Sequence, residues 1–164
     1  MGKKQQKALV VFARILATIS IIGVILALIP LSLPRFLGYE TYNIVSGSME
    51  PELPVGSMVL VKEADPYSIE EGDIIAFNSN ATVVTHRVVY NNQFEKKFIT
   101  KGDANADEDI NPVQYNELIG IVDRHYPVMG AVGNYLTTGS GKLLILEILV
   151  CSMLLFVVSS QIKI

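Results

Sequence analysis

The sequence predicts a mainly β domain that follows an N-terminal transmembrane helix and precedes a second transmembrane helix at the C-terminal side. Three observations support this prediction. The chain of 164 residues is 50% hydrophobic but only 18% charged, a low charged fraction for a soluble domain. Its long uncharged stretches lie near the two ends, and patterns of period two lie between them. These features exclude a disordered chain and argue against an ordinary cytosolic enzyme.

Charge divides the chain into three regions, which we expect to be residues 1–35, 36–142 and 143–164. The first region contains five Lys or Arg residues and no acid. The middle region contains seven Lys or Arg residues against fifteen Asp or Glu residues, and the last contains one residue of each sign. The acidic middle region is long enough for one compact domain.

The first region predicts a transmembrane helix that is retained as a signal anchor. Residues 15–34 carry no charge, which matches the roughly 20 residues needed to cross a hydrocarbon core of ~30 Å. A cleavable secretory signal has a shorter apolar core of about 7–15 residues, and no small-residue cleavage site precedes Pro34. Lys3, Lys4 and Lys7 favour a cytoplasmic N-terminus.

The last region predicts a second membrane helix over residues 143–162. This stretch contains one charge, Glu147, and lies between Lys142 and Lys163. Such a stretch can span a bilayer or lie on its surface, and we expect it to span. A second crossing returns the C-terminus to the cytoplasm and leaves the acidic middle region outside. Cys151, the sole cysteine, lies in this stretch and is expected to act as a small apolar side chain.

The middle region predicts short strands, because apolar residues alternate with polar ones and turn residues separate the runs. The sequence Asn91-Asn92-Gln93 predicts a hairpin turn. The expected strands are residues 57–62, 73–77, 83–90, 97–100 and 118–122.

A tract of small residues after the first helix is a candidate nucleophile site. It reads Ser46-Gly47-Ser48-Met49-Glu50-Pro51. A nucleophilic serine needs a tight, exposed turn where nearby amides can face an oxyanion, and small residues allow such a turn. A plain polar linker has the same composition, so the tract alone leaves both interpretations open.

Two histidines are the candidate general bases. Strand alternation places His86 on one face with Val84 and Val88, whereas His125 lies outside strong alternation. A histidine on an apolar face is commonly a satisfied core residue, but a neutral imidazole there can also accept a serine proton. Lys101 is a weaker candidate, because neighbouring carboxylates favour its charged form.

The acidic run of residues 101–109 allows three interpretations. A carboxylate, from Asp103, Asp107 or Asp109, could orient an imidazole, or the run could be a solvated loop. A calcium loop is the third, but an EF-hand would need glycine and glutamate where the chain has Glu108 and Gln114. The ligands of such a calcium loop would stand at alternate positions of the run: Asp103, Asn105, Asp107 and Asp109.

Four blocks in this order resemble the type I signal peptidases over residues 44 to about 123: Ser46–Pro51, Gly72–Phe77, Thr85–Val89 and Lys101–Asn105. The third block indicates the archaeal and endoplasmic-reticulum type, which has histidine in a His-Arg-Val context where the bacterial type has lysine. The resemblance therefore implies a signal-peptidase-like β fold and the Ser-His-Asp branch of the family.

The resemblance also implies roles for individual residues. Ser48 would be the nucleophile and His86 the general base, with Asp109 ranked ahead of Asp103 as the third member. The Ser48 amide, together with the Ser46 hydroxyl, would stabilise the oxyanion. The chain would then be a membrane serine endopeptidase that removes N-terminal signal peptides from secreted and membrane preproteins, cleaving after small residues.

The implied partners are preprotein signal peptides and the lipid bilayer, with the secretion translocon or accessory subunits as further candidates. We expect the plasma membrane or the endoplasmic reticulum as location, and no nucleic acid, cofactor or metal. Ser48 lies fourteen residues after Pro34, a short separation that would keep the nucleophile near the membrane surface. Asn80 begins a glycosylation sequon on the expected outer side. The alternative function is a catalytically silent β scaffold or subunit that binds a partner.

Overall fold

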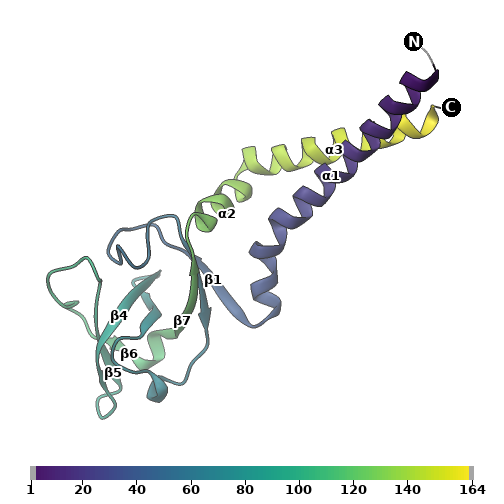
Figure 1. Cartoon of the computed structure of the whole chain (residues 1–164). Helices are drawn as coiled ribbons and strands as arrows, with labels where there is room; N and C mark the ends of the chain where they lie inside the picture. The colour runs from purple at the N-terminus through teal and green to yellow at the C-terminus, as the bar shows by residue number, and fades with distance from the viewer. Residues whose placement is uncertain (1–2, 163–164) are drawn as a thin grey trace. The chain divides into compact units, whose positions relative to one another are not determined.

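The computed structural model describes residues 3–162, which form two compact units. Residues 34–134 form a β domain, and the residues before and after them form a helical unit (Figure 1). The expected fold class, a mainly β domain with a long apolar helix on either side of it in the sequence, is confirmed. The region boundaries expected at residues 35 and 143 stay predictions.

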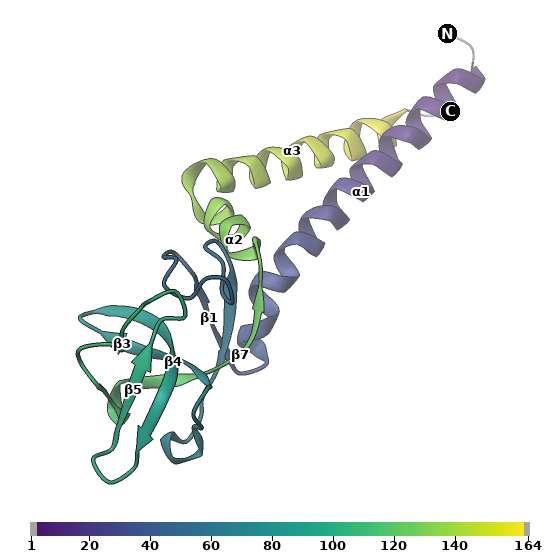
Figure 2. The same ribbon diagram turned by 60° about the vertical axis from the view of Figure 1, so that its left-hand side comes forward.

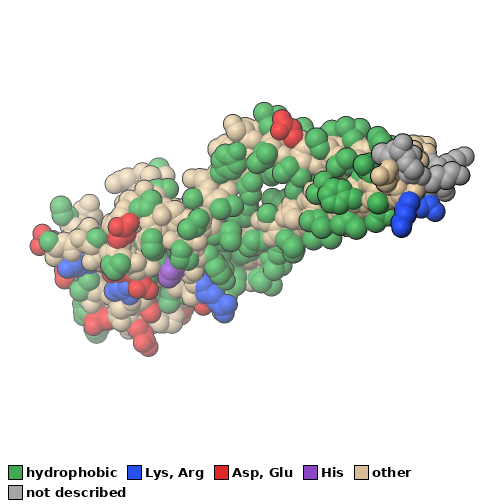
Figure 3. Space-filling view, turned by 45° about the horizontal axis from the view of Figure 1, so that its top comes forward, with side chains coloured by type: hydrophobic (Ala, Val, Ile, Leu, Met, Phe, Trp, Pro, Cys, Tyr) green, Lys and Arg blue, Asp and Glu red, His purple; other side chains and the backbone are tan. Residues whose placement is uncertain are grey.

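The helical unit contains two long helices, α1 (Lys3–Phe36) and α3 (Gly139–Gln161). Both are long and apolar enough to cross a membrane, judged by length and composition. In Figure 3 hydrophobic side chains cover most of both helices and basic side chains lie near the start of α1, whereas most acidic side chains lie on the β domain. Arg14 of α1 donates from Nη2 to the Ser159 carbonyl of α3 at 3.0 Å, which gives this apolar pair of helices a polar contact.

A short helix, α2 (Met129–Thr137), was not expected from the sequence. It begins against the start of a strand, where a Cβ at Gly130 would lie 2.5 Å from the Ser57 carbonyl oxygen. Thr138 then caps α3 by accepting a hydrogen bond from the Gly141 amide at 3.1 Å. The second long helix therefore begins four residues before the predicted stretch.

Seven antiparallel strands form one sheet in the order β1-β2-β7-β3-β4-β5-β6. The last strand of the chain lies between β2 and β3, and β3, β4 and β5 lie side by side (Figure 2). The strands are β1 (Tyr39–Asn43), β2 (Met58–Lys62), β3 (Ile74–Ser79), β4 (Thr82–Asn92), β5 (Lys97–Lys101), β6 (Val113–Gln114) and β7 (Leu118–Tyr126).

The expected strands are all present, but several details of the prediction were wrong. Asn91 and Asn92 belong to β4, and the hairpin turn follows them at residues 93–96. The turn comes later than predicted because of a tertiary contact that holds Asn91 in the strand. The Asn91 side-chain amide donates to the carbonyls of Pro66 and Ile69, at the 3-10 helix Pro66–Ser68 and just after it. Two strands were not predicted from the sequence: β1, a half-polar edge strand, and β6, which has only two residues.

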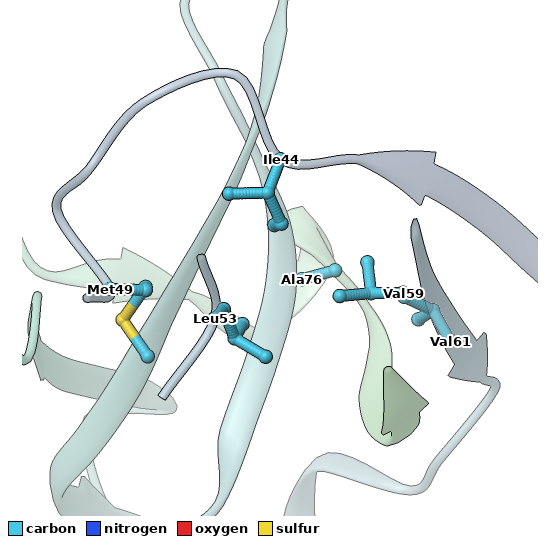
Figure 4. Packing of buried hydrophobic residues seen from close by; sticks show 6 residues of the cluster. All are labelled: Ile44, Met49, Leu53, Val59, Val61 and Ala76. Carbon is cyan, nitrogen blue, oxygen red and sulfur yellow. The ribbon is translucent and has the colours of Figure 1, made fainter. Parts of the chain in front are cut away.

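Two hydrophobic clusters pack against the sheet and reach the region of the candidate site. The first joins the segment after β1 to β2 and β3 (Figure 4), and Met49 in it immediately follows Ser48. The second contains Phe77 of β3 and Val88 of β4, and both are close to His86 of β4. Burial of each large apolar side chain stabilises the fold by about 1.5–3 kcal/mol, so the two clusters hold the segments next to Ser48 and His86 firmly in place.

Candidate active site

Ser48 lies in an irregular segment between β1 and β2, and packing on either side of it holds the segment. Met49 is buried, and its carbonyl accepts a hydrogen bond from the amide of buried Leu53 at 2.8 Å. Glu50 N donates to Gly47 O at 3.1 Å, which closes a tight turn around the serine. Ser48 itself is half-buried, so its hydroxyl stands at the edge of the core.

His86 lies in the middle of β4 and is only 8% exposed. Its ring packs edge-on against Phe77, with centroids 6.3 Å apart. The Nε2 atom is 3.2 Å from the Ser48 hydroxyl oxygen, within hydrogen-bonding distance. The structure therefore brings together the predicted nucleophile and the predicted base, which are 38 residues apart in the chain.

Asp109 is the aspartate that contacts His86. Its Oδ2 atom lies 2.5 Å from His86 Nδ1, so the ring lies between the serine and the carboxylate. With Nδ1–H donating to Asp109, Nε2 is left as an acceptor for the serine proton. This arrangement can perform nucleophilic catalysis by serine.

Asp103 has a different partner. Arg87 donates to it from Nε at 2.8 Å and from Nη2 at 2.6 Å, and donates from Nη1 to the Gly72 carbonyl at 2.8 Å. The hydrogen bond to Asp103 raises the pKa of Arg87 above its ordinary value, although partial burial opposes the shift. Asp103 therefore contacts the residue that follows His86 rather than the imidazole.

The acidic loop, residues 102–109, also contacts the nucleophile segment. Ala104 N donates to the Ser48 carbonyl at 2.9 Å, and a Cβ at Gly102 would lie 2.6 Å from the same oxygen. Lys101, the weaker base candidate, donates from Nζ to the Ala106 carbonyl at 2.9 Å. Its ammonium group therefore supports the loop.

The calcium interpretation finds no matching set of ligands. Asp103 is paired with Arg87, and Asp109 with His86, so two of the four ligands have other partners. Between residues 3 and 162, no group of three or more His, Cys, Asp or Glu side chains is arranged to hold a metal ion.

Thr100 is a site residue that was not predicted from the sequence. It is fully buried in β5, and its hydroxyl donates to Asp109 Oδ2 at 2.7 Å. Its carbonyl accepts from the Asp109 amide at 2.8 Å. The sequence did contain a signal for this residue. Thr100 is a polar residue on the buried face of a strand, two positions after Phe98 and just before the Lys101–Asn105 block.

Two hollows border the serine and the histidine. The smaller, about 80 Å³, is lined by Ser46, Ser48 and apolar side chains that include Ile44, Met49 and Val84. The Ser46 hydroxyl oxygen is 3.4 Å from that of Ser48. The larger hollow, about 370 Å³, is lined by His86, Phe77 and the end of the acidic loop.

The remaining candidates lie elsewhere. His125 is half-buried in β7, paired in register with Val59. Cys151 is exposed on α3. Asn80 is exposed at the tip of the hairpin between β3 and β4, with a positive φ of 46°.

Comparison with known proteins gives one family and two relatives. The family model described as signal peptidase, peptidase S26, matches residues 15–106, which include Ser48, His86 and Asp103 but not Asp109. Signal peptidase I W of Bacillus subtilis (strain 168) is 45% identical over 87 residues, covering 49% of this chain and 44% of that protein. The signal peptidase complex catalytic subunit SEC11 of Candida dubliniensis is 30% identical over 101 residues, covering 54% and 60%. The matches thus span about half the length of these relatives.

Proposed function

The chain belongs to the peptidase S26 family of signal peptidases, and from this premise we propose that it is a membrane-bound serine endopeptidase that removes N-terminal signal peptides from secreted and membrane preproteins. One observation carries the proposal. His86 lies between the Ser48 hydroxyl at 3.2 Å and the Asp109 carboxylate at 2.5 Å. The chain thereby combines the family's expected nucleophile and base with a carboxylate in reach of the ring.

In the proposed reaction, Ser48 Oγ attacks the scissile carbonyl while His86 Nε2 accepts its proton. The protonated imidazole then donates this proton to the leaving amine, and water releases the acyl group by the reverse sequence. Asp109 holds the ring through Nδ1–H and stabilises its charged form without taking the proton. The Ser48 amide and the Ser46 hydroxyl are the proposed donors to the oxyanion.

The smaller hollow supports cleavage after small residues. Its volume of about 80 Å³ accepts a methyl or hydroxymethyl group, and polar and apolar residues line it together. Such a pocket selects by excluding bulk, since it offers little to reward a larger side chain. We therefore propose that it receives the substrate side chain immediately before the cleaved bond.

For the membrane arrangement, we propose that α1 and α3 cross the plasma membrane or the endoplasmic-reticulum membrane. The N-terminus would be cytoplasmic, because of the basic residues before the apolar run. The β domain would be outside the cytoplasm, where a signal peptide held in the same bilayer presents its cleavage site. One relative is by name the catalytic subunit of a complex, which supports accessory subunits as partners; the secretion translocon is a further proposed partner.

Cleavage of a preprotein by the full chain in liposomes tests the function. Ser48→Ala should abolish processing while the circular dichroism spectrum stays that of the wild type. Ser68→Ala is the matched control, because its hydroxyl bonds only within an exposed turn. Undiminished cleavage by Ser48→Ala would contradict the serine mechanism, and a wild-type chain that does not cleave would favour the silent scaffold.

A further inference from the structure

We propose that Thr100 is a positioning residue for this reaction, because its hydroxyl fixes the Asp109 carboxylate in the orientation that holds His86. The inference rests on the proposed peptidase function. The Thr100 hydroxyl bonds to Asp109, and Thr100 is not one of the residues that line the proposed substrate pocket, so its effect would act through Asp109.

The contacts show how one residue holds the aspartate at two points. The Thr100 hydroxyl donates to Asp109 Oδ2 at 2.7 Å, and this is the oxygen that lies 2.5 Å from His86 Nδ1. The Thr100 carbonyl accepts from the Asp109 amide at 2.8 Å. Backbone and side chain of Asp109 are thus both tied to β5, which limits rotation of the carboxylate.

Strand register places the hydroxyl where it is needed. Thr100 pairs with Val88 across β4 and β5, and Val88 lies on the same face of β4 as His86. Thr100 is therefore a diagonal neighbour of the imidazole. The acidic loop leaves β5 after Lys101 and brings Asp109 back against this corner of the sheet.

Burial makes the hydroxyl significant. Thr100 is 0% exposed, and its neighbours on that face, Phe98 and Val88, are buried and apolar. A hydroxyl in such surroundings is costly unless it is hydrogen-bonded, and the Asp109 carboxylate accepts its hydrogen bond. Valine would fill the same space without this cost, so packing alone does not explain threonine here.

The test compares Thr100→Val, which keeps the shape but removes the hydroxyl, with Thr100→Ser, which keeps the hydroxyl. With the full chain in liposomes and a preprotein substrate, Thr100→Val should lower kcat by about tenfold to a hundredfold and leave KM nearly unchanged. Thr100→Ser should recover most of the lost kcat. Ser57→Ala is the matched control, since it removes a fully buried hydroxyl that has no hydrogen-bond partner among the described residues.

Nuclear magnetic resonance gives a readout that does not need activity. The chain has two histidines, so ¹⁵N-histidine labelling yields two imidazoles, and His125→Gln assigns them. The His86 Nδ1 proton should move or broaden in Thr100→Val, return in Thr100→Ser and stay unchanged in Ser57→Ala. If Thr100→Val fails to fold by circular dichroism, Thr100→Ala replaces it with the same expectations.

The outcomes separate this inference from the proposed function. A wild-type kcat in folded Thr100→Val, or an unchanged His86 resonance, would overturn the positioning role while leaving the peptidase function intact. Failure of Thr100→Ser to recover kcat would also overturn it. If the wild-type chain does not cleave, the proposed function fails, and the resonance alone decides whether Thr100 orders the histidine.

Discussion

His86 and Arg87 are consecutive in β4, so their side chains leave the strand on opposite faces. Each meets a different aspartate of the acidic loop: His86 meets Asp109, and Arg87 meets Asp103. The two carboxylates have similar local sequences but different partners. The alternation of side chains along β4 therefore puts His86, which has a proposed catalytic role, and Arg87, which has a structural one, on opposite faces of the strand.

Substitution by asparagine should distinguish the two aspartates. Asp109→Asn removes the negative charge beside Nδ1 and allows the wrong imidazole tautomer, so kcat should fall by about a thousandfold or more. Asp103→Asn weakens a partly exposed ion pair and should lower the free energy of unfolding by about 1–2 kcal/mol, with a smaller loss of activity. Preprotein cleavage and urea denaturation measure the two effects.

Each of these two variants, Asp109→Asn and Asp103→Asn, is the control for the other. If Asp103→Asn reduces kcat more than Asp109→Asn does while both remain folded, the proposed assignment of the third catalytic residue is wrong.

The acidic loop between β5 and β6 acts on several parts of the site. It holds the Ser48 carbonyl through Ala104, Arg87 through Asp103 and His86 through Asp109. At the scale of elements, this one loop connects the serine segment with β4. Its close approach to Ser48 depends on Gly102, which has no side chain to obstruct it.

Gly102→Ala should therefore disturb the site. The added Cβ would lie 2.6 Å from the Ser48 carbonyl oxygen, a backbone atom that cannot move without shifting the serine. We expect kcat to fall by at least about tenfold, which corresponds to ~1.4 kcal/mol of the barrier. Preprotein cleavage, with circular dichroism to verify folding, measures the change.

Gly139→Ala is the control, because nothing lies within 4 Å of a Cβ at that position at the start of α3. Wild-type activity in Gly102→Ala would show that the loop tolerates displacement and does not position the serine.

At the scale of the whole molecule, the distribution of charge and apolar surface favours two membrane crossings. The helices α1 and α3 are largely apolar, and the acidic residues concentrate in the β domain (Figure 3). The sole cysteine makes the proposed topology convenient to test, because Cys151→Ser gives a background without thiols.

In that background, Phe94→Cys and Lys4→Cys should react differently with a membrane-impermeant maleimide. Phe94 is fully exposed at the turn between β4 and β5, so its substitute should be labelled on intact cells. The Lys4 substitute should be labelled only after permeabilisation, because the basic N-terminus is proposed to be cytoplasmic. The reverse pattern of labelling would contradict the proposed orientation.

Much of the fold could be predicted because the signals are local. The uncharged run of residues 15–34 and the period-two run around His86 directly indicate a long apolar helix and a half-buried strand. The resemblance to type I signal peptidases, carried by short blocks, is confirmed by the family match. The hairpin turn after β4 was misplaced because Asn91 bonds to a segment more than twenty residues away in the chain.

The sequence by itself determined the apolar and acidic regions, the strand character around His86 and the candidate residues Ser48, His86, Asp103 and Asp109. Only the tertiary structure decided which aspartate faces the imidazole and that Thr100 lies behind it. The physical reason is that composition and periodicity are properties of neighbouring residues, whereas these contacts depend on the β4–β5 register and the path of the acidic loop. A hydroxyl at position 100 acquires a partner only when the loop returns Asp109 to within 2.7 Å of it.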